Sequence, residues 1–395
     1  MRVYLDYNAT TPVDPAVFEA MTPYLAENFG NAGSIHSSGQ RARSAVDAAR
    51  ESVAALVGAK SSEIVFTSGG TEADNLAIVG MVEGALSAGN SVRRQHVITS
   101  TIEHHAVLNT CQELEKRGVE VSYVPVSAQG VIDPADLRRA LRPETRLITV
   151  MHTNNELGTI QPIEEIGQIA KEAGVCFHCD AVQSAGKLPL DVGRLGVDLL
   201  SISAHKIYGP KGTGALYVRS GVSIEPLFHG GHAERDRRAG TENVPGIVGM
   251  GQAAELAREH LAADSGRIRA LRDRLEKALL EKIPAARANG DRTRRVPNTA
   301  NFTFSSAGGE ALVIALDLQG VECSSGAACS SGSVEPSHVL TAIGLSDDEA
   351  RSSIRISLGR PTTAAEIDQA IRVIPGVVER LRALSPHSVT EVPTP

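Results

Sequence analysis

The segment SISAHKIYGPKGTGALYV, residues 201–218, is the most informative part of this sequence. Two short β-rich runs, 199–203 and 214–218, enclose a glycine-rich turn, and Lys206 follows the first run. In open α/β folds, ligands bind beyond the carboxyl ends of the parallel strands. A lysine at that edge can form a Schiff base with an aldehyde cofactor, although this segment alone is also compatible with an ordinary surface lysine.

The middle of the chain alternates apolar runs with helical patterns, which predicts an α/β fold with a mostly parallel central sheet and helices on both faces. A helical pattern from about residue 252 to 283 then leads into a smaller α+β domain. The predicted strands are Glu63–Thr67, His96–Thr99, Val119–Val124, Leu147–Met151, Val175–Cys179, Leu199–Ser203 and Gly214–Val218.

The length of 395 residues exceeds what one hydrophobic core usually serves, so two domains are expected. We predict a large domain over 14–257, a small domain formed by 1–13 with 258–385, and a tail over 386–395. Helix starts are predicted at Asp14-Pro15 and Asp133-Pro134, and a capping box at Thr363–Glu366.

Composition excludes several classes of protein. A net charge of −7 and the absence of tryptophan argue against nucleic-acid binding. No apolar run is long enough to span a bilayer, and the first residues do not resemble a signal peptide. Five irregularly spaced cysteines do not form a disulfide framework, so we expect a reducing cytoplasm and no membrane.

Two further segments fit a cofactor site with Lys206. Asp180 ends an apolar run 26 residues earlier. It could keep a pyridine nitrogen protonated, or simply cap the next helix. After the run 63–67, Gly69, Gly70 and Thr71 open a helical pattern, where backbone N–H groups and the helix dipole can bind phosphate. The alternative for this segment is an ordinary strand–helix turn, since no Walker motif is present.

The motifs YLDYNATTP (4–12), TSGGTEADN (67–75), TIEHHAV (101–107), MHTNNELG (151–158), HCDAVQ (178–183) and SAHKIYGPKG (203–212) together resemble the NifS/IscS-type cysteine desulfurases. The resemblance runs from residue 4 to about residue 363. It implies a fold-type-I enzyme, similar to aspartate aminotransferase, that uses pyridoxal 5′-phosphate to remove sulfur from L-cysteine.

The resemblance also implies roles for individual residues. Lys206 would hold the cofactor and act in catalysis with His104, which would stack on the ring. Arg355 would grip the carboxylate of L-cysteine. The remaining cofactor contacts would come from Asp180 at the ring nitrogen, Gln183 at the ring oxygen, Asn155 beside cofactor and substrate, and Gly70, Thr71, Ser203 and His205 at the phosphate. Thr241 would reach the phosphate of a partner subunit, which implies a homodimer with shared active sites.

Cys329 lies in a Ser/Gly/Ala-rich run, 323–333, that predicts a mobile loop. By resemblance, Cys329 is the catalytic thiol that takes the sulfur as a persulfide, leaves alanine, and passes the sulfur to an iron–sulfur scaffold or another acceptor protein. A positive charge nearby, such as that of His104, is expected to favour its thiolate. No resident metal is expected, although transient ligation of a cluster by Cys329 stays open.

A zinc site is the alternative for two other pairs of residues. Cys176 and Cys179 have metal-ligand spacing, but in one strand their side chains point to opposite faces. His104 and His105 are adjacent, which is unfavourable for shared ligation on a helix. We therefore predict buried structural cysteines, including Cys111 and Cys323.

Three other functions are compatible with parts of this sequence. A selenocysteine lyase of the same fold performs similar chemistry and differs in selectivity. An aminotransferase or decarboxylase would leave the 323–333 loop unexplained. A non-catalytic scaffold would leave the combination of Lys206, Asp180, His104 and Cys329 unexplained.

Overall fold

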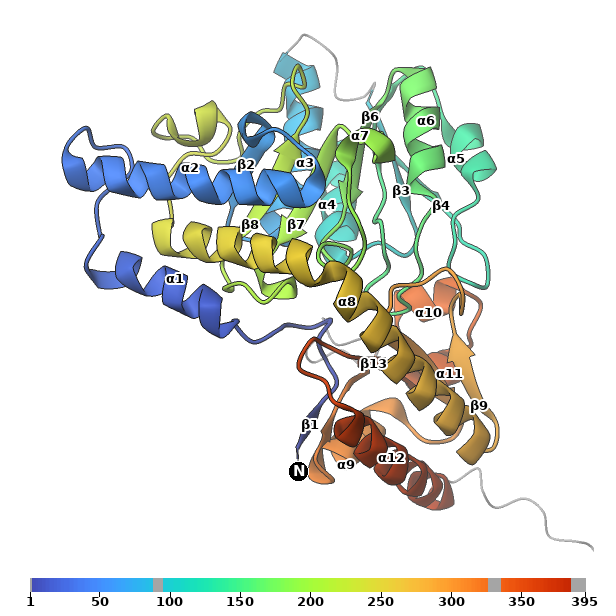
Figure 1. The fold of residues 1–395 in the computed structure, drawn as a ribbon. Helices are drawn as coiled ribbons and strands as arrows, with labels where there is room; N and C mark the ends of the chain where they lie inside the picture. Colours follow the sequence, from blue (N-terminus) through green and yellow to red (C-terminus); the bar gives the residue numbers. More distant parts are fainter. Residues whose placement is uncertain (1, 88–94, 326–334, 385–395) are drawn as a thin grey trace, which may run out of the picture.

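The computed structural model describes residues 2–87, 95–325 and 335–384 (Figure 1). An upper body surrounds a seven-stranded sheet and a lower body surrounds a four-stranded sheet. The long helix α8 (Val244–Lys282) runs from one to the other. The α/β fold expected from the sequence is confirmed.

The large sheet contains all seven strands predicted from the sequence. Its spatial order is β2 (Ile64–Thr67), β8 (Gly214–Val218), β7 (Leu199–Ser203), β6 (Cys176–Asp180), β5 (Thr145–Thr149), β3 (His96–Ser100) and β4 (Glu120–Val124). Neighbours from β7 through β4 are parallel, whereas β8 runs antiparallel to both β2 and β7. The sheet is therefore mostly parallel, and the carboxyl ends of six strands share one edge.

Helices bury both faces of this sheet, which explains the apolar strands. One face packs against α2 (Ser37–Val57), α6 (Ile163–Ala173) and the first half of α8. The other face packs against α3 (Gly70–Ser87) and α4 (His105–Lys116). The same body also contains α1 (Pro15–Ala26), α5 (Pro134–Ala140) and α7 (Val192–Leu195).

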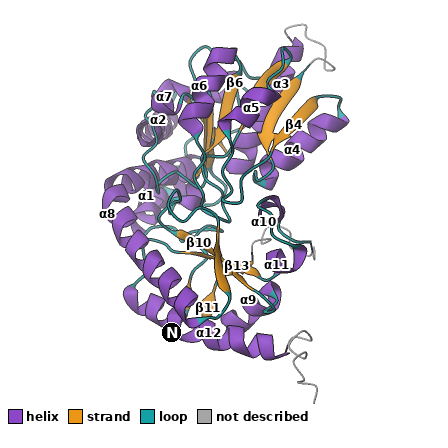
Figure 2. Cartoon of the chain, turned by 90° about the vertical axis from the view of Figure 1, so that its right-hand side faces the viewer, coloured by secondary structure: helices purple, strands orange, loops and turns teal. Residues whose placement is uncertain are grey.

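The smaller sheet is antiparallel and carries its own core, with α8, α9 and α12 around it (Figure 2). Its order is β12 (Ser324–Ser325), β13 (Ser353–Ser357), β10 (Thr299–Phe304) and β9 (Ala286–Asn289). A separate parallel pair joins β1 (Val3–Tyr4) to β11 (Val321–Glu322). The helices are α9 (Gly309–Leu318), α10 (His338–Ala342), α11 (Asp347–Arg351) and α12 (Ala364–Leu384).

Helix α8 contributes to both cores. Ile247 and Ala257 pack in the core of the large sheet, and Ile268 and Leu279 pack in that of the small one. Our proposed boundary between residues 257 and 258 falls within this helix, between the two groups of side chains. The proposed 386–395 tail lies outside the described residues.

The predicted helix starts have the expected caps. Asp14 Oδ1 accepts a hydrogen bond from Ala16 N at 2.9 Å, and Asp133 Oδ1 accepts one from Ala135 N at 2.8 Å. Thr363 and Glu366 bond reciprocally as a capping box before α12. Across the described ranges, no helix is both long and apolar enough to cross a bilayer.

Candidate active site

A cavity of about 350 Å³ opens at the carboxyl edge of the large sheet. It lies where Brändén's rule places ligand sites. All but two of the predicted site residues line it: Gly70, Thr71, His104, Asn155, Asp180, Gln183, Ser203, His205, Lys206 and Arg355. Of the other two, Thr241 does not line it and Cys329 lies outside the described residues.

Lys206 enters the cavity from a short 3₁₀ turn directly after β7. Its Nζ donates hydrogen bonds to the backbone oxygens of Asn8 at 2.5 Å and Ala9 at 2.8 Å. The N-terminal segment around Asn8 and Ala9 thus lies against the turn that contains Lys206 and accepts hydrogen bonds from its amine. Thr11 extends this contact, because its N donates to the backbone oxygen of His205 at 3.0 Å.

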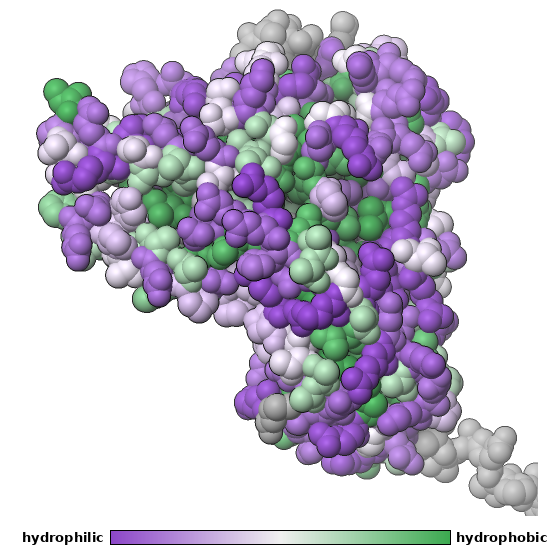
Figure 3. Space-filling model, in the orientation of Figure 1, coloured by the Kyte–Doolittle hydropathy of each residue, from purple (hydrophilic) through white to green (hydrophobic). Residues whose placement is uncertain are grey.

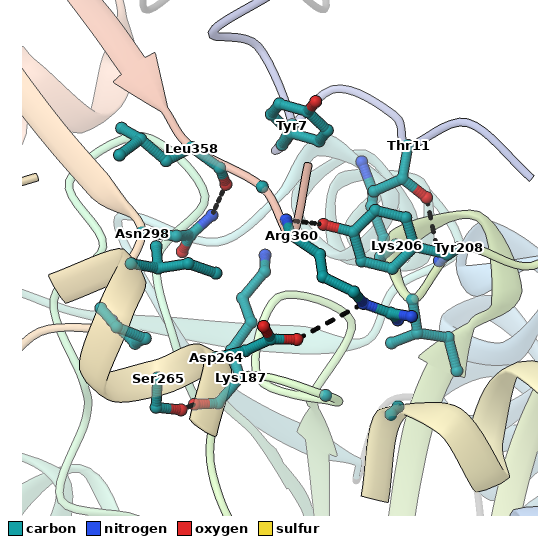
Figure 4. Close-up of a pocket in the computed structure, with 16 residues that line it drawn as sticks. Tyr7, Thr11, Lys187, Lys206, Tyr208, Asp264, Ser265, Asn298, Leu358 and Arg360 are labelled. Carbon is teal, nitrogen blue, oxygen red and sulfur yellow. Dashed lines mark hydrogen bonds and ion pairs between the residues drawn. The ribbon is translucent and has the colours of Figure 1, made fainter. Parts of the chain in front are cut away.

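The backbone after Lys206 is strained and firmly held. Tyr208 has a φ of 68°, which is unfavourable for a residue with a side chain. Its N donates to Thr11 Oγ1 at 2.9 Å, and its ring lies 4.3 Å below the guanidinium of Arg360 (Figure 4). These contacts from both ends of the chain fix the direction in which the lysine leaves the sheet.

Asp180 ends β6 and is buried in the cavity wall. Its Oδ1 accepts a hydrogen bond from Val182 N at 2.9 Å. Burial raises the pKa of this carboxyl to about 6, against an opposing effect of Lys206. Asp74, on α3, lines the same cavity, and its pKa is raised well above its ordinary value by burial and by Asp180. We infer that Asp74 keeps its proton, so that Asp180 is the carboxyl available to pair with a bound cation.

His104 caps α4, with its Nδ1 accepting a hydrogen bond from Ala106 N at 3.1 Å. Burial, and then the charge of Lys206, lower the pKa of His104 to about 4. The ring is therefore neutral near pH 7 and carries its proton on Nε2. The expectation that His104 supplies positive charge to a thiolate was wrong, because its position as a buried helix cap disfavours the imidazolium.

The predicted phosphate cradle is present at the start of α3. Gly70 and Thr71 open this helix, so backbone N–H groups face the cavity. A Cβ on Gly70 would come within 2.8 Å of the Val182 side chain, so only glycine leaves the present packing undisturbed. The hydroxyl of Ser203 is buried without a hydrogen-bond partner among the described residues, as expected for a group awaiting an acceptor. This donor set fits a phosphate.

Arg355 reaches the cavity from β13 in the smaller sheet. It is buried, Nη1 donates to the backbone oxygen of Asn155 at 3.1 Å, and Nε has no partner among the described residues. The neighbouring strand β12 pairs Ser324 with Arg355. Strand β12 is followed directly by the segment 326–334, which carries Cys329 and lies outside the described residues.

The chain returns at α10, beside the start of α4. Ser337 Oγ donates to Glu156 Oε2 at 2.6 Å, and His338 Nε2 lies 2.9 Å from the backbone oxygen of Glu103. The His338 and His105 rings are 4.8 Å apart. The described residues on either side of the segment that carries Cys329 are thus held near the cavity, one by pairing with Arg355 and the other by packing on His105, the neighbour of His104.

Thr241 is exposed and does not line the cavity of its own chain. Five other lining residues were not predicted from the sequence: Asn8, Ala9, Asp74, Met151 and Val182. All five lie within motifs quoted above for the resemblance. Their presence in these motifs was the sequence signal that could have identified them as site residues.

Of the four cysteines in the described ranges, Cys111, Cys179 and Cys323 are buried as predicted, and Cys176 is half-buried. Cys176 packs on the α3 and α4 face of the sheet, and Cys179 packs on the opposite face. Burial raises the pKa of both Cys111 and Cys323 to about 12. Within the same ranges, no group of three or more metal-ligating side chains is found.

Comparison with known proteins gives a consistent result. The class-V aminotransferase family model matches residues 3–370. A protein of Dictyoglomus turgidum described as cysteine desulfurase IscS is 51% identical over 386 residues, covering 98% of this chain and 97% of the relative. Among solved structures, a NifS-like protein covers 96% of this chain and all of its own, with 39% identity and a TM-score of 0.89. A structure described as SspA in complex with cysteine covers 90% of this chain and 98% of its own, with 42% identity and a TM-score of 0.80.

Proposed function

The chain belongs to the class-V aminotransferase family and is a cysteine desulfurase, and from that premise we propose that it works with pyridoxal 5′-phosphate held by Lys206. The observation that carries the proposal is the meeting of Lys206, Asp180 and Arg355 in one cavity, although they come from three strands of two sheets. An amine, a buried carboxyl and a guanidinium are the groups needed for the aldehyde, the ring nitrogen and the substrate carboxylate.

The cavity also supports the other cofactor contacts. Gly70, Thr71 and Ser203 would bind the phosphate, together with His205. Gln183 and Asn155 would face the ring, and His104 would stack on it. When bound, the cofactor supplies an electron sink for breaking bonds next to the amino acid's α-carbon.

The residues of this chain bind the substrate and transfer its protons. Arg355 binds and orients the carboxylate of L-cysteine by a planar, two-pronged contact. The amine of Lys206 takes and returns protons at the α-carbon and β-carbon of the substrate. His104 is neutral near pH 7, so its Nε2–H can donate a hydrogen bond in the site without adding a positive charge there.

We propose that the thiol of Cys329 accepts the sulfur. Overall, L-cysteine and the Cys329 thiol give L-alanine and a Cys329 persulfide. The substrate's carbon–sulfur bond is replaced by a carbon–hydrogen bond, and a sulfur–sulfur bond forms on the enzyme. The pairing of Ser324 with Arg355 and the packing of His338 on His105 support this role, because Arg355 and His104, the neighbour of His105, line the cavity.

We further propose a homodimer in which Thr241 completes the phosphate site of the partner. Its exposed position outside its own cavity fits that role. Apolar side chains around α1 and the start of α2 are also exposed and favour an interface there (Figure 3). The most exposed are Phe18 (59%), Leu25 (61%), Phe29 (80%) and Ile35 (92%).

The persulfide needs a recipient and a compartment. We propose that an iron–sulfur scaffold, or another acceptor protein, removes the sulfur from Cys329. We place the reaction in the cytoplasm, because Cys329 must return to a free thiol in each cycle and the cysteines of the described ranges are all free thiols.

An absorption spectrum before and after L-cysteine tests the proposal. Purified protein should be yellow, should change its visible band when L-cysteine is added, and should form alanine. A Lys206→Ala variant should retain no cofactor after borohydride treatment and denaturation, whereas the unmodified chain should. A colourless protein that pyridoxal phosphate does not reconstitute would overturn the proposal.

A further inference from the structure

Lys187 lies behind the predicted cofactor contact Gln183, four residues later on the turn that follows β6. Its Nζ donates hydrogen bonds to Gln183 Oε1 at 2.6 Å and to Asn8 Oδ1 at 3.2 Å. Figure 4 shows its side chain reaching into a second cavity, which Lys206 also lines. Lys187 does not line the cofactor cavity itself, so it acts there only through its neighbours.

The surroundings of Lys187 favour a neutral amine. Burial, followed by the charges of Lys206 and Arg355, lowers the pKa of Lys187 well below its ordinary value. Asp264 lines the same cavity, but it pairs with Arg360 at 3.4 Å. A neutral amine has two N–H groups, and the two acceptors found here, Gln183 and Asn8, satisfy both of them.

These contacts also fix the direction of the Gln183 amide. Because Lys187 donates to the carbonyl oxygen, the Nε2 group must face the other way. It donates to the backbone oxygen of Asn8 at 3.0 Å, the same atom that accepts from Lys206. The amide therefore presents its N–H donor on the side of Lys206, where the cofactor would be held.

We propose that Lys187 is a positioning residue, which holds the carbonyl of Gln183 so that its N–H faces the oxygen on the cofactor ring. This inference rests on the proposed use of pyridoxal phosphate. Without Lys187, the amide could turn its oxygen toward the ring oxygen, and two acceptors would then face each other. A neutral Lys187 also adds no second positive charge beside Lys206.

The test compares Lys187→Met, Gln183→Leu and the double variant, with Lys171→Met as the control at an exposed lysine of α6. Cofactor dissociation constants and the pH dependence of the visible band are measured for each holoenzyme. Lys187→Met should weaken cofactor binding roughly tenfold and reduce the long-wavelength band, in which the ring oxygen is ionised. In the Gln183→Leu background, Lys187→Met should change neither quantity further.

A second measurement uses the unmodified chain without cofactor, so it does not depend on a variant that folds. Competitive acetylation over a pH range, read by mass spectrometry, gives the titration of Lys187 directly. Acetylation of Lys187 as fast as that of the exposed Lys171 would overturn the inference, because an amine held by Gln183 and Asn8 must react more slowly. So would an equal effect of Lys187→Met with and without Gln183, or an unchanged spectrum in Lys187→Met. If the unmodified chain binds no pyridoxal phosphate, the proposed function fails first and the inference fails with it.

Discussion

Asp6 and Arg355 are joined by a hydrogen bond of 2.7 Å between Oδ1 and Nη2. The two residues are 349 positions apart, and the pair lies where β13 passes the segment after β1. The backbone oxygen of Asn155 holds Nη1 of the same guanidinium. Two fixed acceptors therefore set the plane of the arginine before any substrate arrives.

Asp6→Asn should raise the KM for L-cysteine about tenfold and leave kcat within about twofold. The amide keeps the volume of Asp6 but loses the charge that orients the proposed carboxylate-binding group. Steady-state kinetics with alanine detection measures both constants. Asp317→Asn is the control, because Asp317 pairs with Arg2 at the exposed surface and should change neither. A fall in kcat at constant KM would contradict this account of Asp6.

Most of the large sheet could be predicted because its strands are short, apolar and separated by helices. The boundaries were less accurate for one strand, since the run Leu147–Met151 was predicted and Thr145–Thr149 is observed. Val150 and Met151 are buried beyond the end of the ladder, so their apolarity reflects burial and not strand pairing. Two-residue strands such as β1 and β11 have too little periodicity to be seen in sequence.

The site was predictable where side-chain chemistry gives the signal, as at Lys206, Asp180 and Arg355. It was not predictable where the backbone makes the contact. Asn8 and Ala9 accept hydrogen bonds from Lys206 through main-chain oxygens, which every residue type possesses. Their partner is nearly 200 positions away, so only the fold could bring them together.

His104→Asn should separate the chemical role of His104 from its structural one. Asparagine is a good N-cap, so α4 should stay capped and the free energy of unfolding should change by less than about 1 kcal/mol. Losing the ring and its Nε2–H should lower kcat about 100-fold. Urea unfolding and steady-state turnover measure the two effects. His260→Asn, at an exposed histidine of α8, is the control, and equal losses in both variants would refute a specific role for His104.

The raised pKa of Glu156 predicts that the free energy of unfolding depends on pH. Glu156 is buried beside Ser337, and burial raises its pKa to about 7 from an ordinary value of 4.5. Below pH 4.5 both the folded and unfolded states hold the proton. Between pH 4.5 and 7 the unfolded chain releases it first, so the free energy of unfolding falls as pH rises, by about 3 kcal/mol in all.

Glu156→Gln should remove this component while keeping an acceptor for Ser337. The stability of the unmodified chain relative to the variant should therefore decline from pH 4.5 to 7 and stay level above that. Urea unfolding at a series of pH values measures the difference. Glu165→Gln, at an exposed carboxylate of α6, is the control for loss of surface charge. A difference that does not vary with pH would mean that the pKa of Glu156 is the same in the folded and unfolded chain, which would contradict this account.

Cys329→Ser should abolish persulfide formation and lower desulfurase turnover at least 100-fold, because a hydroxyl does not accept sulfur as a thiolate does. Binding of L-cysteine should persist, since Arg355 and the cavity are unaltered, so the spectral change should remain while alanine formation nearly stops. Mass spectrometry after treatment with ³⁴S-labelled L-cysteine locates the transferred sulfur. Cys323→Ser is the control, because it removes a buried thiol near the same segment. In this variant the persulfide should still form on Cys329. Labelled sulfur on the Cys329→Ser chain at unmodified levels would assign the acceptor role to another residue.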